Sequence, residues 1–139
     1  MQRIAFLGTG IMGAHMATRL AAAGRDVIAW NRTPAKADAL APGGVSVAQS
    51  PSHAVAQTDA VIVMLSTAAV VDEVLFARDA SGAVPAEALP DGTLVVVTSS
   101  QPVDAARRQA ARLAARGVRY VDAPVSGGER GAREGTLAI

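Results

Sequence analysis

Short apolar runs alternate along the chain with Ala-rich segments in which apolar and polar residues recur at helical spacing. The apolar runs predict strands near residues 3–8, 26–31, 44–47, 59–65, 93–98 and 118–122. The segments between them predict helices near 11–23, 34–41, 51–57, 67–77 and 102–116. Prolines stand where several of these helices should begin, and glycines where two of them should end. The segment 79–92 contains two prolines and two glycines and is expected to be a loop.

The order of these elements predicts the fold class. A strand that is apolar throughout, such as Ala60 to Leu65, is typical of a parallel sheet that helices cover on both faces. Regular alternation of strand and helix then indicates an α/β fold, a Rossmann-type doubly wound parallel sheet, with residues 1–139 forming one dinucleotide-binding domain. Residues 136–139 look like the start of another strand, so we expect the domain to be truncated at its C-terminal end.

The helix expected over 102–116 carries a basic stripe. Its apolar face should contain Val103, Ala106, Ala110, Leu113 and Ala114. The opposite face contains Arg107, Arg108, Arg112 and Arg116. No aromatic residues interleave with these arginines, so we interpret them as a solvated outer surface. The chain has a net charge of +1, which gives no reason to expect a nucleic-acid or membrane partner.

Several classes of protein are disfavoured by what the chain lacks. No basic leader and no apolar run of membrane-spanning length occurs. The absence of cysteine removes thiol chemistry and fits a reducing cytoplasm, where we expect the protein to reside. No cluster of metal-ligating residues is expected either.

The stretch from Gly8 to Gly13 reads GTGIMG, and it follows the first expected strand and opens the first expected helix. In that position the pattern is typical of dinucleotide binding. The first glycine allows a tight turn, the second lets a pyrophosphate approach the backbone, and the third lets the helix pack close to the strand. Amide groups at the helix start then face the phosphates. Cofactor contacts are therefore expected from Gly8, Gly10, Ile11, Met12 and Gly13. The alternative is a glycine-rich turn without a ligand.

The residues that follow the second strand bear on the choice of cofactor. An acidic residue there, about 20 residues after the glycines, would bind the ribose 2′-hydroxyl of NAD. The chain instead has Asn31, Arg32 and Thr33. Arg32 can pair with the 2′-phosphate of NADP and stack on the adenine, Asn31 and Thr33 can add hydrogen bonds, and Lys36 can add charge. This pattern favours NADP and leaves NAD possible. Alternatively, Arg32 is a surface residue and Thr33 merely starts a helix.

Two blocks carry a resemblance to a known family. Residues 4–24 resemble its opening GLGxMGxxMAxNLxxxG, and residues 122–128, DAPVSGG, match its substrate-loop motif without a change. The chain resembles the β-hydroxyacid dehydrogenases, which include 3-hydroxyisobutyrate dehydrogenase, tartronate semialdehyde (2-hydroxy-3-oxopropionate) reductase and, more distantly, 6-phosphogluconate dehydrogenase.

The resemblance implies roles for further residues. Ser126, Gly127 and Gly128 would hold the substrate carboxylate and hydroxyl near the nicotinamide. Leu65 and Ser66 would pass the adenosine, although Ser66 replaces the family's proline. Ser100 would lie near the nicotinamide, while Val97 stands where the family has an aspartate.

The resemblance also implies what is missing. The family uses a lysine as general acid/base on a helix beyond the substrate loop, and Lys36, the only lysine here, does not match it. No catalytic residue is therefore expected in the chain, and His15 and His53 are expected to be structural. The family's all-helical C-terminal domain, which completes the site and the oligomer, is also absent.

These observations lead to a hypothesis with two alternatives. The chain is expected to be the NADP-binding domain of an oxidoreductase that moves hydride between nicotinamide and a short-chain β-hydroxy acid. By itself it should be inactive, while the full-length enzyme would bind a small hydroxy-acid substrate and form a homo-oligomer. One alternative is a non-catalytic dinucleotide-binding module. The other is an imine-reductase-like enzyme, because the opening and the stretch from Trp30 to Pro34 look similar in that class.

Overall fold

The computed structural model describes residues 2–139 and contains a six-stranded sheet whose paired strands are all parallel. The strands are β1 (Arg3–Leu7), β2 (Asp26–Trp30), β3 (Ser46–Val47), β4 (Ala60–Val63), β5 (Leu94–Val97) and β6 (Arg119–Asp122). They lie in the order β3-β2-β1-β4-β5-β6, so the direction of winding reverses between β1 and β4. This arrangement confirms the Rossmann-type fold. The crevice at such a reversal, outside the carboxyl ends of the strands, is where doubly wound sheets bind ligands.

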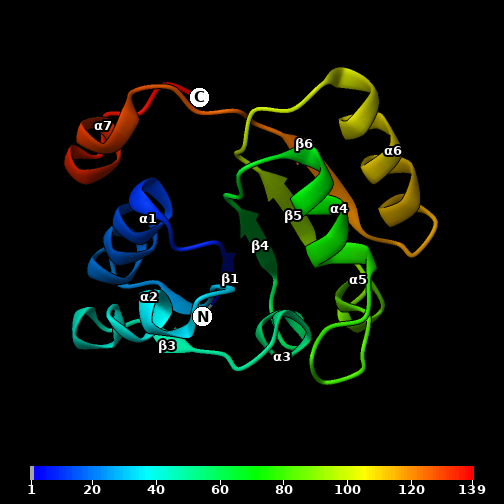
Figure 1. Ribbon diagram of the computed structural model, residues 1–139, viewed down its shortest axis with the longest axis horizontal. Coiled ribbons are helices and arrows are strands. Elements are labelled where there is room, and N and C mark those ends of the chain that lie inside the picture. Colours follow the sequence, from blue (N-terminus) through cyan, green and yellow to red (C-terminus); the bar gives the residue numbers. More distant parts are fainter. Residues whose placement is uncertain (1) are drawn as a thin grey trace.

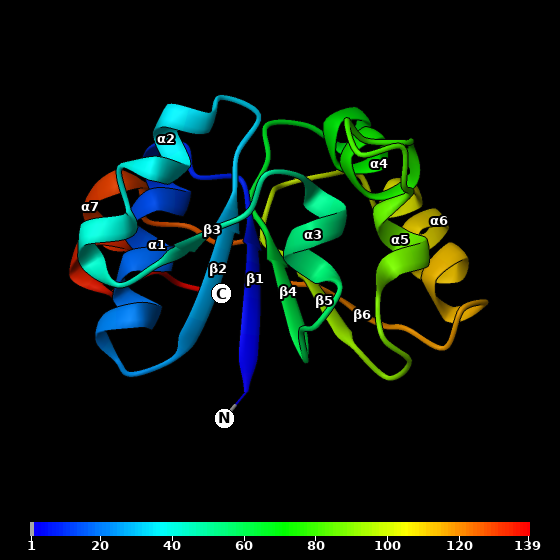
Figure 2. The ribbon, with the colours of Figure 1, turned by 90° about the horizontal axis from the view of Figure 1, so that it is seen from below.

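Helices lie on both sides of the sheet (Figure 1). They are α1 (Ile11–Ala22), α2 (Pro34–Asp38), α3 (Pro51–Val55), α4 (Ala68–Phe76), α5 (Pro85–Ala88), α6 (Val103–Ala114) and α7 (Gly128–Glu134), with a 3-10 turn at Ala41–Gly43. Figure 2 shows α1, α2 and α7 on one side and α3 to α6 on the other. Pro34 and Pro51 begin their helices as predicted, because the ring presets the helical φ where no amide donor is needed.

The sheet separates two apolar clusters. On the larger side, Val61, Val63 and Val97 are fully buried beneath the helices from α3 to α6. On the other side, Phe6 and Val27 pack with Ala17 of α1. Alternate residues of each strand thus enter different clusters, as the pleat requires.

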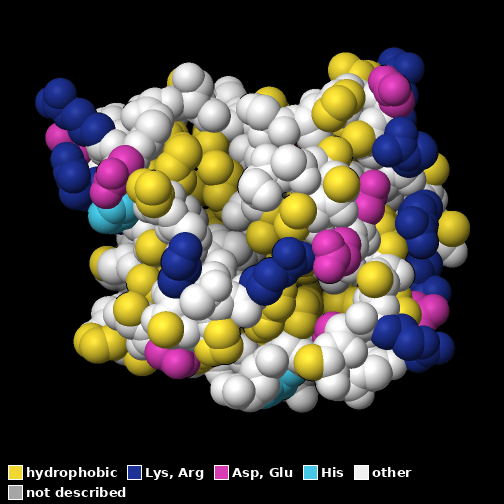
Figure 3. Space-filling view, in the orientation of Figure 1, with side chains coloured by type: hydrophobic (Ala, Val, Ile, Leu, Met, Phe, Trp, Pro, Cys, Tyr) yellow, Lys and Arg dark blue, Asp and Glu magenta, His cyan; other side chains and the backbone are white. Residues whose placement is uncertain are grey.

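Helices cover both faces as expected, but coverage of the second side is incomplete over β4 to β6. Ile62 is only half-buried, and Val121 is 44% exposed. The cause is that α1 covers the strands near β1, while α7 lies against α1. An apolar hollow of about 420 Å³ remains, lined among others by Ile62, Val96, Leu137 and Ile139. Figure 3 shows hydrophobic side chains gathered there, beside the C-terminal segment.

Three local expectations also need correction. The expected loop 79–92 contains α5, a four-residue helix that begins at Pro85 and buries Ala86. It is too short to show a period in the sequence. The glycine-rich stretch after residue 127 forms α7, which was not expected. Within residues 136–139, Ala138 forms a single antiparallel bridge with Ser126. The expected strand does not form in this described segment.

The buried face of α6 is rotated from the one expected. It consists of Ala105, Ala106, Gln109 and Leu113, while Val103 is 61% exposed. Gln109 can be fully buried because its amide is hydrogen-bonded to other side chains, as described below. Two of the arginines also contact α4: Arg112 stacks on the ring of Phe76 at 3.9 Å, and Arg108 lies 4.0 Å from Asp72.

In the described part of the chain, no helix is long and apolar enough to cross a bilayer.

Candidate dinucleotide-binding site

A cavity of about 280 Å³ lies at the carboxyl ends of β1, β2 and β4. The loops after these strands contribute Gly8 and Gly10, Asn31 and Arg32, and Leu65 and Ser66. Trp30, Met64, Lys36 of α2 and two valines of α4 also line it. The structure therefore brings together expected cofactor residues from three separate segments, whereas Ser100, from a fourth segment, does not line this cavity.

The three glycines of the first loop differ in what surrounds them. Gly8 has φ +103°, and a Cβ there would run into the carbonyl oxygen of Met64, so the tight turn requires glycine. A Cβ at Gly13 would run into the carbonyl oxygen of Gly8 and lie 3.2 Å from Cε1 of Phe6. A Cβ at Gly10 would meet nothing within 4 Å. Gly10 thus borders open space, where a phosphate can approach the backbone.

The start of α1 offers donors to an anion. Within the described residues, no side chain caps this helix and no acidic residue lies in its first turn. The amides of Ile11, Met12 and Gly13 belong to that turn and lack intrahelical partners. Ile11 is 70% exposed, so its side chain leaves the approach open. The arrangement fits the phosphates of a dinucleotide.

Asn31 lines the cavity, and its side chain also makes two hydrogen bonds to the backbone. Its Oδ1 accepts a hydrogen bond from the amide of Thr9 at 2.9 Å, and its Nδ2 donates to the carbonyl of Thr33 at 3.2 Å. The Gly8 amide also donates to the Trp30 carbonyl at 2.9 Å. Asn31 therefore ties the glycine loop to the loop after β2. Its side-chain amide already serves the backbone and has less left to offer a ribose.

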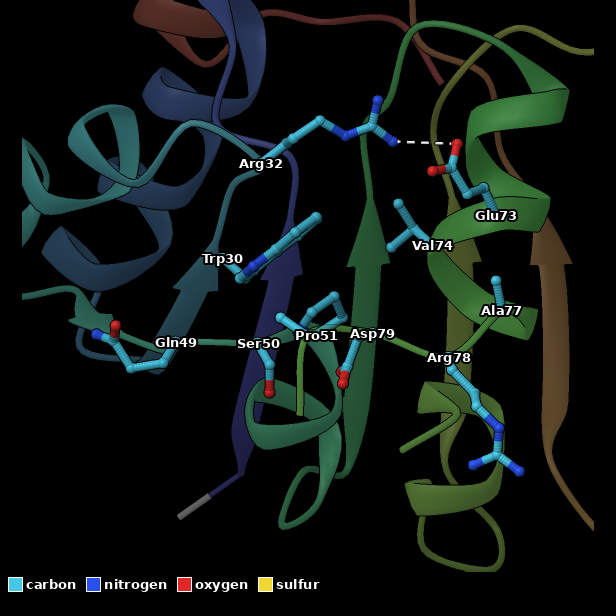
Figure 4. Close-up of a pocket in the computed structure, with 11 residues that line it drawn as sticks. Trp30, Arg32, Gln49, Ser50, Pro51, Glu73, Val74, Ala77, Arg78 and Asp79 are labelled. Carbon is cyan, nitrogen blue, oxygen red and sulfur yellow. Dashed lines mark ion pairs between the residues drawn. The ribbon is translucent and has the colours of Figure 1, made fainter. Parts of the chain in front are cut away.

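Arg32 reaches across the top of the site to α4. Its Nη2 lies 3.2 Å from Oε2 of Glu73, and the two side chains are 60% and 62% exposed (Figure 4). Thr33, at the N-cap of α2, is exposed, as is Lys36. The charged groups at this end of the site are thus accessible to a ligand from solvent.

A second cavity of about 260 Å³ adjoins the first, and Arg32, Trp30 and Val74 line both. Figure 4 shows Trp30 and Val74 facing each other below Arg32, with Pro51 beneath them. Such an apolar and aromatic wall can hold the face of a purine. Trp30 and Val74 were not predicted as site residues, although Trp30 directly precedes Asn31.

Asp79 closes the far end of this second cavity. Partial burial opposes its ionisation, but hydrogen bonds from Ser52 and Ser81 prevail and lower the pKa of Asp79 to about 2. The Ser52 amide lies 2.9 Å from Oδ2, and the Ser81 amide 2.9 Å from Oδ1. The carboxylate thus joins the start of α3 to the loop after α4.

The ends of β4 and β5 are joined by hydroxyl groups. Ser99 Oγ accepts a hydrogen bond from the Leu65 amide at 2.8 Å, and Thr98 Oγ1 donates to the Val63 carbonyl at 2.9 Å. Val97, at the position of the family's aspartate, is fully buried in the core. The two residues after Val97, Thr98 and Ser99, thus link the ends of the two strands, while Ser100 is exposed beyond them.

A partly buried polar network supports the loop that contains Ser100. Gln101 Nε2 donates to the Tyr120 hydroxyl at 2.7 Å, and that hydroxyl donates to Gln109 Oε1 at 2.8 Å. Gln109 Nε2 in turn donates to Asp72 of α4 at 3.0 Å. Burial, with the charge of Asp122, raises the pKa of Tyr120 to about 12, so the hydroxyl stays a donor at neutral pH. Sequence reasoning missed this network because its members lie far apart along the chain.

The expected substrate residues lie apart from these cavities. Ser126, Gly127 and Gly128 are exposed, and as far as residues 2–139 define the cavities, none of the three lines one. Ser126 exchanges two backbone hydrogen bonds of 2.9 Å with Ala138. Gly127, with φ +139°, precedes α7. The structure holds the loop in a defined shape but does not bring it into the dinucleotide cavity.

The two histidines line neither of these two cavities. His15 of α1 lies 3.3 Å from Glu129 of α7, and Arg19 donates to the Arg133 carbonyl at 3.1 Å. His53 is exposed on α3. His15 thus has a structural contact between two helices. Among residues 2–139, no group of three or more His, Asp or Glu side chains could hold a metal ion.

Comparisons with known proteins place the chain in a family. Residues 3–139 match the model of the NAD-binding domain of 6-phosphogluconate dehydrogenase. The chain is 42% identical over 139 residues to a probable 3-hydroxyisobutyrate dehydrogenase of Mycobacterium tuberculosis, covering all of this chain and 45% of the relative. It is 38% identical over 137 residues to 2-hydroxy-3-oxopropionate reductase of Escherichia coli, again covering 45% of the relative. The chain thus spans less than half the length of these proteins.

Solved structures agree. The structure of Mycobacterium tuberculosis 3-hydroxyisobutyrate dehydrogenase with L-serine matches 99% of this chain and 45% of its own, with a TM-score of 0.89 and 39% identity. An imine reductase from Myxococcus stipitatus in complex with NADP⁺ matches 93% of this chain and 43% of its own, with a TM-score of 0.82 and 26% identity. The chain belongs to the β-hydroxyacid dehydrogenase family, and it carries that family's NAD-binding domain.

Proposed function

We propose that this chain is the NADP-binding domain of an oxidoreductase that transfers hydride between nicotinamide and a short-chain β-hydroxy acid. The observation that carries the cofactor choice is Arg32, which is exposed at the end of β2 and lines the cavity beside the glycine loop. No carboxylate follows β2 to bind a ribose 2′-hydroxyl, since residues 31–33 are Asn, Arg and Thr. A guanidinium there suits a 2′-phosphate.

Each part of the site has a role in this proposal. The amides of Gly10 to Gly13 bind the pyrophosphate, Arg32 and Lys36 bind the 2′-phosphate, and Leu65 and Ser66 border the adenosine. Trp30 and Val74 form the apolar wall of the same region. Ser100 orients the nicotinamide from the end of β5. The bound cofactor supplies the hydride chemistry, and these residues position it.

The substrate part of the proposal rests on Ser126, Gly127 and Gly128. Two glycines bring backbone amides close to an anion, and the Ser126 hydroxyl can donate or accept. They are proposed to hold the carboxylate and hydroxyl of the hydroxy acid. The proton of that hydroxyl would move to a lysine outside residues 1–139, in the homo-oligomeric full-length enzyme. We therefore expect cofactor binding, without hydroxy-acid turnover, from the 139-residue chain.

Fluorescence titration tests the cofactor part directly. Trp30 is the only tryptophan of the chain and lines both cavities, so a bound dinucleotide should quench its emission. NADPH should bind more tightly than NADH. Equal affinity for the two would contradict the NADP preference, and no binding of either would contradict a dinucleotide site. Steady-state oxidation of 3-hydroxyisobutyrate by the purified chain, at rates normal for an enzyme, would contradict the proposal that these 139 residues lack the general base.

The likeness to an imine reductase bound to NADP⁺ supports one alternative activity, the reduction of an imine. The sequence DAPVSGG at residues 122–128 favours the hydroxy acid over an imine, because it matches the substrate loop of the β-hydroxyacid dehydrogenases. Assays of the full-length protein with a cyclic imine and with 3-hydroxyisobutyrate separate the two. A non-catalytic module would turn over neither.

A further inference from the structure

The guanidinium that would receive the 2′-phosphate already has a partner. Arg32 Nη2 lies 3.2 Å from Glu73 Oε2, and the pair spans the space between the end of β2 and α4 (Figure 4). Both residues line the second cavity. Trp30 and Val74 line this cavity and the first one as well. An anion that approaches Arg32 from this cavity therefore meets Glu73 as well.

The other acidic groups nearby are engaged elsewhere. Asp72, next to Glu73 on α4, accepts a hydrogen bond from Gln109 at 3.0 Å and lies 4.0 Å from Arg108. Asp79 accepts hydrogen bonds from Ser52 and Ser81. Glu73 is thus the carboxylate positioned to compete for Arg32, while Lys36 adds positive charge to the first cavity.

We propose that Glu73 is a specificity-determining residue that lowers the preference for NADP over NAD. It holds Arg32 as a counter-ion that the 2′-phosphate must displace. NAD has a hydroxyl at this position and can bind with the ion pair intact. This inference rests on the proposed function, in which Arg32 binds the 2′-phosphate.

The size of the effect follows from the exposure of the pair. Both side chains are more than half exposed, so solvent screens the interaction strongly. An exposed ion pair of this kind changes an equilibrium by up to about fivefold. We therefore expect Glu73→Gln to lower the Kd for NADPH about three- to fivefold and to leave the Kd for NADH within about twofold. Gln keeps the size of the side chain and removes its charge.

The test uses the Trp30 titration on wild-type chain, Glu73→Gln, Arg32→Ala and the double variant, with Glu87→Gln, exposed on α5, as the matched control. The gain in NADPH affinity should appear in Glu73→Gln, vanish in the Arg32→Ala background and be absent from the control. In competition assays, Glu73→Gln should bind 2′,5′-ADP, which carries the 2′-phosphate, more tightly by the same factor. Its affinity for 5′-AMP, which lacks that phosphate, should not change. Circular dichroism verifies the fold of each variant.

The outcomes separate this inference from the proposed function. If the wild-type chain binds both dinucleotides and Glu73→Gln has the same ratio of NADPH to NADH affinity, the role of Glu73 is overturned. The proposed function then still stands. A loss of NADH affinity in that variant, without a gain for NADPH, would also overturn it, since Glu73 would then be a ribose ligand. Wild-type chain that binds neither dinucleotide would overturn both.

Discussion

The side-chain oxygen of Asn31 accepts a hydrogen bond from the backbone amide of Thr9, at 2.9 Å. Because the same side chain also donates to the Thr33 carbonyl, it fixes the glycine loop relative to the start of α2. A residue expected to add hydrogen bonds to a 2′-phosphate thus also shapes the glycine loop. That role concerns the part of the cofactor that NAD and NADP share.

Replacement of Asn31 by alanine should therefore weaken both dinucleotides alike. It leaves the partly buried Thr9 amide without its acceptor, which should cost about 1–3 kcal/mol of unfolding free energy. Titration with NADPH and NADH, together with urea unfolding, measures the two effects. Gln57→Ala, at an exposed position after α3, serves as control. A selective loss of NADPH would show instead that Asn31 contacts the 2′-phosphate.

Replacement of Arg32 by alanine should act on NADPH alone. The loss of its charged hydrogen bonds to the 2′-phosphate should weaken NADPH by roughly 1.5–3 kcal/mol, with little effect on NADH. Isothermal titration calorimetry of wild type and variant measures the difference, and Arg107→Ala, exposed on α6, controls for the change in net charge. Equal losses for both cofactors would place Arg32 against the adenine and not the phosphate.

Gly10→Val should abolish dinucleotide binding and leave the fold intact. The space around Gly10 is open and its φ is −69°, so the backbone accepts a side chain, but that side chain occupies the approach of the pyrophosphate. Far-UV circular dichroism should stay near that of wild type. Gly8→Ala is the instructive comparison, because there the backbone itself should be destabilised. Unchanged affinity in Gly10→Val would mean that the phosphates lie elsewhere.

Asp79 should make the stability of the chain depend on acid pH. Its folded pKa of about 2 lies below the ordinary aspartate value of 3.8, so its stabilising contribution is fully present above about pH 4 and is lost as the pH falls toward 2. Asp79→Asn should lower the unfolding free energy by about 1 kcal/mol at pH 7, and the deficit should shrink as the pH falls from 4 to 2. Urea unfolding across this range measures it, with the exposed Asp38→Asn as control. A deficit independent of pH would contradict a role for the charge.

The apolar hollow beside β4 and β5 should make the 139-residue chain self-associate. Ile62, Val96 and Leu137 line it, and Ile139 at its rim is 90% exposed. Sedimentation velocity over a range of concentrations should show association that Ile139→Glu reduces. Val103→Glu, on the other side of the sheet, adds the same charge and should change nothing. A wild-type chain that stays monomeric throughout would contradict the prediction.

The parts predicted correctly from the sequence are those with local causes. Apolar runs located all six strands, and proline placed the starts of α2 and α3, because these signals act within a few residues. The prediction for the buried face of α6 was wrong because Gln109, a polar residue, is buried there. Its amide is hydrogen-bonded to Asp72 of α4 and to Tyr120 of β6. In the site, Arg32 could be found beside β2, but its partner Glu73 is brought near only by the fold.

Gly8 also limits how the protein family can change. With φ +103° and the Met64 carbonyl oxygen where a Cβ would lie, any substitution at Gly8 damages the domain before it alters cofactor choice. Arg32 and Glu73 are exposed and can be exchanged at little structural cost. Under the proposed function, cofactor preference can therefore diverge between relatives through two surface substitutions while the turn beneath them stays fixed.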